Sequence, residues 1–325
     1  MLFASLAFAS SGDRAEQFQR CLSLCSSRIC SPTQPKALPF PLRLTGWTCE
    51  DDCKYSCMHL ITEQAIEAGS RIHQYYGKWP FWRFCGMQEP ASVLFSLLNL
   101  LFHAEGVYLM RSKIPDGHPM KGYYTGFALV SVNAWIWSAV FHTRDLPNTE
   151  KMDYFSAAAA ILYALYYTVI RMFHLYSTRH RLEVAPSTRP AILKPWTALC
   201  LILFIGHVSY LSLLPRFDYT YNMAFNLVIG LLHNLLWLLY SLPTSLIRRF
   251  PSRPRTYRPK CAWKAALFVF LTTAATSLEL FDFPPWWRVI DAHALWHLAT
   301  VPIAASWYDF LVEDALDEGW RALKH

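Results

Sequence analysis

Seven apolar stretches, each close to 20 residues long, dominate the sequence between residues 91 and 311. A helix needs about 20 apolar residues to cross the ~30 Å hydrocarbon core of a bilayer, so each stretch could span a membrane. With 54% hydrophobic and only 16% charged residues, the chain is too apolar for an ordinary soluble domain. The sequence therefore predicts an all-α, seven-transmembrane helix bundle, with spans at Ala91–Met110, Tyr123–Phe141, Tyr154–Met172, Trp196–Leu214, Met223–Leu242, Ala262–Leu280 and Ala292–Leu311.

Lysines and arginines are distributed unevenly among the loops between these spans. Fourteen lie in or beside the first, third and fifth loops, whereas the even-numbered loops carry only four: Arg144, Lys151, Arg216 and Arg288. Because cytoplasmic loops are enriched in basic residues, we expect the odd-numbered loops and the tail at 313–325 to be cytosolic and the N-terminus to be luminal. The basic residues of these loops account for the net charge of +7, so no nucleic-acid partner is expected.

The polar segment before the first span holds six of the nine cysteines: Cys21, Cys25 and Cys30, then Cys49, Cys53 and Cys57. This density indicates a disulfide framework in an oxidising lumen. The helix-like spacings favour a nested pairing (21–57, 25–53, 30–49), which is one of fifteen possible connectivities; cysteine-bound zinc is the competing interpretation. We expect a luminal cysteine-rich segment at 12–88, preceded at 1–11 by a signal-peptide remnant or a disordered terminus.

The last apolar stretch opens with Asp291-Ala-His-Ala-Leu-Trp-His297, which contains two histidines four residues apart. On a helix this spacing puts both imidazoles on one face, where they could bind one metal ion; packed core histidines are the alternative. Ser138 and His142 share this spacing at the luminal end of the second span, and Asp153 begins the third. The topology brings all five side chains to one membrane level, which favours a functional site because ionisable groups in a membrane are costly.

Metal-dependent hydrolysis is the chemistry expected of this group. The predicted zinc ligands are His142, His293 and His297, with a fourth position open to water, whose pKa zinc lowers to about 7. Ala294 occupies the place of the glutamate in a His-Glu-x-x-His motif, so Asp153 is assigned as general base and then general acid. Ser138 is assigned to hydrogen-bond the water or the developing oxyanion. A Ser–His nucleophilic pair and a hydroxyl bonded to its own helix carbonyl remain alternatives for Ser138.

Nine short motifs carry a resemblance to a known family. They are Gly46–Cys57, Gly77–Phe81, Gln88–Ser92, Asn133–Asp145, Thr149–Phe155, His207–Ser212, Arg216–Tyr219, Leu280–Pro285 and Asp291–His297. On these motifs the chain resembles the Per1-like family, which belongs to the CREST superfamily of seven-helix membrane hydrolases. The resemblance implies that the superfamily's serine, aspartate and three histidines correspond to Ser138, Asp153, His142, His293 and His297.

The resemblance also implies a function, namely fatty-acid remodelling of glycosylphosphatidylinositol (GPI) anchors. The family is regarded as removing the sn-2 acyl chain, a phospholipase A2-type ester hydrolysis, so the expected substrate is the lipid moiety of GPI-anchored proteins and the expected cofactor is Zn2+. We expect a membrane hydrolase domain at 89–312 in the endoplasmic reticulum membrane, with the Golgi membrane as the alternative. Two other functions stay open: a hydrolase of another membrane lipid, such as a ceramidase-like amidase, and a non-enzymatic receptor or cargo escort with a structural metal.

Overall fold

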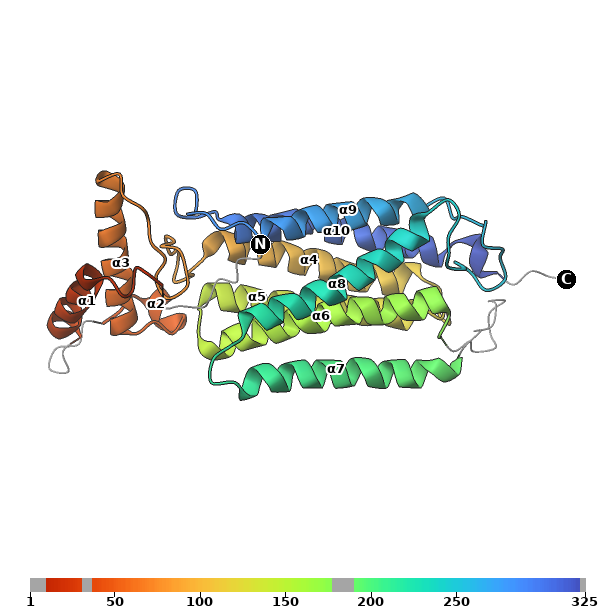
Figure 1. Cartoon of the computed structure of the whole chain (residues 1–325), viewed down its shortest axis with the longest axis horizontal. Coiled ribbons are helices and arrows are strands. Elements are labelled where there is room, and N and C mark those ends of the chain that lie inside the picture. The colour runs from red at the N-terminus through yellow and green to blue at the C-terminus, as the bar shows by residue number, and fades with distance from the viewer. Residues whose placement is uncertain (1–9, 31–36, 177–189, 322–325) are drawn as a thin grey trace.

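A computed structural model describes residues 10–30, 37–176 and 190–321 of the chain. Within these ranges the chain forms a bundle of long helices with a small helical cap at one end, and it contains isolated β-bridges but no β-strand (Figure 1). The all-α prediction is therefore confirmed for the described residues. Most of the predicted signal-peptide remnant and the last residues of the predicted tail lie outside them.

The bundle has seven helices within the described ranges, and they run along the long axis of the molecule (Figure 1). They are α4 (Pro90–Lys113), α5 (Lys121–Thr143), α6 (Pro147–Phe173), α7 (Leu193–Leu213), α8 (Tyr219–Ser241), α9 (Ala262–Leu278) and α10 (Ala292–Ala315). Each helix in the series α4, α5, α6, α8, α9 and α10 packs against the next one, and α10 packs against α4. Six helices thus close a ring, and α7 packs against α6.

Five of these helices, α4 to α8, are long and apolar enough to cross a membrane. The apolar helix α9 has only 17 residues; its rise of ~26 Å falls short of a ~30 Å hydrocarbon core. The 24-residue helix α10 is long enough, but its polar residues include His293, His297 and Asp314. A multi-pass membrane protein is therefore supported, while a count of seven spans stays a prediction.

The cap, which comprises residues 10–30 and 37–88, contains α1 (Glu16–Ile29), α2 (Phe40–Leu44) and α3 (Cys49–Glu67). Three disulfides join its two cysteine clusters: Cys21–Cys57, Cys25–Cys53 and Cys30–Cys49. This is the nested pairing, which arises because cysteines about one turn apart on two antiparallel helices meet in reverse order. Since all six cysteines are disulfide-bonded, the alternative of cysteine-bound zinc in this segment is wrong.

Loop residues and side chains of α3 make the hydrogen bonds and ion pairs between the cap and the bundle. The Trp82 backbone N–H donates to the Arg288 carbonyl at 2.8 Å, and the Trp79 indole N–H donates to the Asp282 carboxylate at 2.7 Å. A third contact is the ion pair of Arg144 and Asp51, with a nitrogen–oxygen distance of 2.7 Å. Several charges of the predicted luminal loops therefore dock the cap.

At the opposite end of the bundle, Arg171 of α6 and Asp314 of α10 form a fully buried ion pair. The guanidinium donates two hydrogen bonds of 2.8 Å to the carboxylate, which also accepts from the hydroxyls of Tyr124 and Tyr240. A buried charge in a membrane domain needs such partners. The network ties α10 to α5, α6 and α8 and so fixes its level in the bundle.

Candidate metal centre

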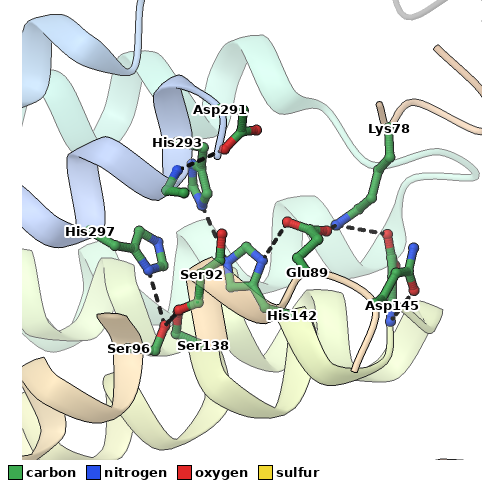
Figure 2. Close-up of polar contacts among 12 residues, drawn as sticks. Lys78, Glu89, Ser92, Ser96, Ser138, His142, Asp145, Asp291, His293 and His297 are labelled. Carbon is green, nitrogen blue, oxygen red and sulfur yellow. Dashed lines mark hydrogen bonds and ion pairs between the residues drawn. The ribbon is translucent and has the colours of Figure 1, made fainter. Parts of the chain in front are cut away.

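Three histidines converge where the bundle meets the cap (Figure 2). His142 lies at the end of α5, and His293 and His297 lie in the first two turns of α10. Their ligand atoms all lie within 4.8 Å of one another, and the Nε2 atoms of His142 and His293 are 3.2 Å apart. The structure thus brings the three predicted ligands together as a possible three-histidine metal site.

The start of α10 determines the position of two of these rings. Asp291 is the N-cap, and its carboxylate accepts a hydrogen bond of 2.8 Å from the Ala294 backbone N–H. Such a cap satisfies an amide that has no partner inside the helix. Because the helix begins at Ala292, His293 and His297 lie one turn apart on the same face, as the four-residue spacing predicts.

Two of the histidines donate hydrogen bonds to carboxylates that sequence reasoning missed. His142 Nδ1 donates to Glu89 Oε2 at 2.8 Å, and His293 Nδ1 donates to Glu279 Oε2 at 2.8 Å. Because Nδ1 carries the proton, a neutral ring presents the lone pair of Nε2 to the centre. Carboxylate–histidine pairs of this kind orient metal ligands and raise their basicity, so these residues fit a metal ion.

The third histidine is held by a serine instead. His297 Nδ1 lies 3.0 Å from the hydroxyl of Ser96 on α4, which donates to the Ser92 carbonyl and therefore accepts from the ring. The Ser138 hydroxyl also lies 3.0 Å from that of Ser96. Ser138 thus reaches the histidines through Ser96, a residue that sequence reasoning did not select.

The charges around Glu89 and Glu279 keep both carboxylates ionised. Burial raises the pKa of Glu89, but the Lys78 ammonium and His142 outweigh burial and hold the pKa well below its ordinary value. Burial also raises the pKa of Glu279, and His293 brings it below its ordinary value. Ionised carboxylates are the form that accepts hydrogen bonds from imidazole N–H groups.

A cavity of about 200 Å³ adjoins His293. This volume is smaller than that of a typical pocket for a drug-sized ligand, which is ~300–1,000 Å³. The cavity could hold the reacting group of a larger molecule, with the remainder outside. Its lining residues are Glu279, Phe281, Asp282, Phe283, Asp291, Ala292 and His293.

Asp153 lies near the start of α6, where it is half-buried. It interacts electrostatically with His293, Lys78, Glu89 and Glu279, but it makes no hydrogen bond to any residue in the described ranges. Its carboxylate therefore remains available to a reacting molecule.

A signal for the missed carboxylates exists in the sequence, although it is weak. Glu89 lies two residues before the first apolar stretch, and Glu279 lies at the end of the sixth, so both lie at the predicted luminal level. Other acidic residues lie at the same level, including Asp145 and Asp282, which pair with residues of the cap. Only the packing of α4, α5, α9 and α10 selects the two that contact histidines.

The fold and the site define a class: a multi-pass helical membrane protein with a candidate three-histidine metal centre at one end of its bundle. Residues 39–315 match the Per1-like family, and the chain belongs to this family. The resemblance stated from the motifs is confirmed. No solved structure matches the chain.

Relatives of known name cover nearly the whole chain. A Mus musculus protein named GPI-specific phospholipase A2-like PGAP3 is 41% identical over 97% of this chain and 92% of its own length. The Homo sapiens protein of the same name is 39% identical over 96% of this chain and 92% of its own length. The Schizosaccharomyces pombe protein named Protein PER1 homolog is 42% identical over 94% of this chain and 87% of its own length.

Proposed function

We propose that the chain remodels GPI anchors by hydrolysing the sn-2 acyl ester of their lipid. The names of relatives that match it over nearly their full length support the pathway. The observation that carries the chemistry is the convergence of His142, His293 and His297, two of which donate hydrogen bonds to carboxylates.

Zn2+ is the metal that suits this set of donors. Three neutral imidazoles with a fourth position open are typical of catalytic zinc, whereas Mg2+ and Ca2+ prefer oxygen ligands. When bound, the ion would act as a Lewis acid that polarises the ester carbonyl and stabilises the charge developing on its oxygen. Glu89 and Glu279 would hold two of the rings in the orientation and tautomer that binding requires.

Asp153 is the residue to which we assign proton transfer. Its carboxylate would accept a proton from the attacking water, whose oxygen forms the new bond to the acyl carbon. It would then return that proton to the sn-2 oxygen as the ester bond breaks. The products are a free fatty acid and a lyso-form of the anchor lipid, so the reaction consumes one water and needs no other reactant.

Ser138 is assigned a supporting role at the developing oxyanion. Its hydroxyl lies 3.0 Å from Ser96 and can turn from that partner to donate to the substrate oxygen. The network through Ser96 and His297 keeps Ser138 beside the histidines. This arrangement favours the positional role over a Ser–His nucleophilic pair, because no histidine hydrogen-bonds Ser138 directly among the described residues.

The expected location is the luminal leaflet of a secretory-pathway membrane. Three disulfides favour an oxidising compartment for the cap, and the cap adjoins the histidine cluster (Figure 2). An endoplasmic reticulum membrane with a luminal N-terminus and a cytosolic C-terminus fits this arrangement, with the Golgi membrane as the alternative.

Lipid analysis of GPI-anchored proteins from cells that lack GPI-anchor remodelling tests the proposal. Expression of the wild-type protein should restore removal of the original sn-2 acyl group from the anchors. Asp153→Asn, expressed at an equal level, should not restore it. Full restoration by Asp153→Asn would instead favour a non-enzymatic receptor or escort. An unchanged anchor profile with altered ceramide would favour a ceramidase-like amidase.

A further inference from the structure

Lys78 belongs to the cap, and the packing of the cap determines its position. It ends a tight turn in which the Tyr75 backbone N–H donates to the Lys78 carbonyl at 2.8 Å and the Lys78 N–H donates back at 3.0 Å. Gly77 lies in this turn with a φ of +81°, in the left-handed region that suits glycine. Tyr75 is buried with Phe18 and with Cys57 of the disulfide Cys21–Cys57. The cap core therefore fixes the backbone from which Lys78 extends.

The side chain of Lys78 reaches out of the cap to the bundle (Figure 2). Its ammonium forms an ion pair with Glu89, lies 3.3 Å from the Asp145 carboxylate and lies 4.2 Å from the centre of the Phe141 ring. Only 5% of the Glu89 side chain is exposed. A buried carboxylate needs a cation or several donors to remain charged, and Lys78 supplies the cation.

Glu89 uses its other carboxylate oxygen for a metal-site histidine. Lys78 contacts Oε1, whereas Oε2 accepts the 2.8 Å hydrogen bond from His142 Nδ1. The Glu89 backbone N–H also donates to the His142 carbonyl at 3.0 Å. An unbroken path of polar contacts therefore runs from the cap through Glu89 to one ring of the three-histidine cluster.

We propose that Lys78 is a positioning residue through which the disulfide-bonded cap holds His142 in its metal-binding orientation. The cap is then part of the metal centre rather than a separate luminal domain. Without the ammonium, the Glu89 carboxylate would face Asp145 with no cation between them, and it would turn away from His142. The inference rests on the proposed three-histidine metal centre and does not depend on the lipid substrate.

Other contacts dock the cap without touching a histidine, and they provide a matched control. The Arg144–Asp51 ion pair joins the same two parts of the molecule at 2.7 Å. Asp51→Asn weakens that ion pair, keeps an acceptor oxygen for the Thr48 cap of α3, and leaves Lys78, Glu89 and His142 unchanged. This variant should therefore keep its metal affinity.

Chelator competition for Zn2+ on the purified full-length chain, with disulfides intact and no lipid substrate present, tests the proposal. Lys78→Met should weaken zinc affinity about 10–100-fold, Lys78→Arg should restore most of it, and Asp51→Asn should match the wild type. Wild-type affinity in Lys78→Met would overturn the proposal, as would an equal loss in Asp51→Asn.

A double-variant cycle keeps the test decisive if Lys78→Met folds poorly. Lys78→Met combined with Glu89→Gln removes both charges of the pair, so the double variant avoids an unpaired buried charge. If Lys78 acts through Glu89, the double variant should bind zinc as weakly as Glu89→Gln alone, whereas two independent, additive losses would overturn the proposal. A wild-type chain that binds zinc but releases no fatty acid would contradict only the proposed lipid hydrolysis.

Discussion

The Nε2 atoms of His142 and His293 lie 3.2 Å apart, although 151 residues separate the two histidines in the chain. Each ring donates from its Nδ1 atom to a carboxylate, Glu89 or Glu279, and the two Nε2 atoms lie within hydrogen-bond distance of each other. If one ring is protonated at Nε2, the pair can share an N–H···N hydrogen bond. If both rings are neutral, their two lone pairs suit a shared cation.

Asp153→Asn should abolish most hydrolysis while leaving the metal bound. The amide cannot accept the proton from water, and loss of general acid–base catalysis typically lowers the rate by ~10²–10⁴. Zinc content should stay at the wild-type level, because Asp153 contacts none of the three rings through a hydrogen bond in the described structure. Fatty-acid release and metal content measured on one preparation check both parts; metal loss in Asp153→Asn would reassign this residue.

Ser96→Ala should weaken zinc binding more than Ser138→Ala does. Ser96 accepts the hydrogen bond from His297 Nδ1, whereas Ser138 hydrogen-bonds only Ser96 among the residues that the structure describes. Loss of a partner that orients a metal ligand typically weakens affinity by ~10–100-fold. Chelator competition compares the two variants directly. Equal affinities would mean that Ser96 does not orient His297.

Asp314→Ala should destabilise the bundle by ~3–5 kcal/mol, because removing one partner leaves the buried Arg171 charge unpaired. The neighbouring Glu313→Ala is the control. Glu313 forms an exposed ion pair with Lys264, and such pairs contribute only ~0–1 kcal/mol. Unfolding in a denaturing detergent series measures both variants, and similar losses would show that the buried network does not secure α10.

Acid should destabilise the docked cap through His59. Burial, followed by the charge of Arg288, lowers the pKa of His59 from its ordinary 6.5 to about 3. Its ring Nε2–H donates to the Phe81 carbonyl at 3.0 Å and its Nδ1 accepts from Arg288. The folded state therefore binds fewer protons than the unfolded state below pH 6.5, and stability decreases as pH falls, by ~1.4 kcal/mol between pH 7.5 and 5.5.

His59→Gln isolates this contribution, since glutamine can donate and accept in the same place but does not titrate. The unfolding free energy of His59→Gln should fall less steeply with acid than that of the wild type. Other buried histidines, such as His118, contribute equally to both curves. Parallel curves for the two proteins would contradict the assignment of the slope to His59.

Local periodicity explains what could be predicted of this site. The four-residue spacings of His293 with His297 and of Ser138 with His142 determine which side chains share a helix face. The apolar lengths and loop charges then indicate which helix ends meet at one membrane level. The nested disulfides follow the same logic, because Cys21 and Cys57 begin and end two clusters with helical spacing.

The contacts that hold the ligands depend instead on tertiary packing. Glu89 lies 53 residues from His142, and no repeat or spacing links them. The contacts of Lys78 are even harder to predict from the sequence, because a lysine in a polar segment is usually solvated and seldom lies between two carboxylates. The sequence predicted the seven helices of the bundle, but the number that cross the membrane stays a prediction, since α9 is shorter than the apolar stretch that predicted it.

Metal content and fatty-acid release of the purified chain test the central claim most directly. The wild type should carry one Zn2+ per chain and release the sn-2 fatty acid from a GPI-anchored substrate. His293→Ala should lose both, because it removes one of the three ligands. A wild-type chain without bound metal, or a His293→Ala variant that keeps the metal and the release of fatty acid, would contradict the account.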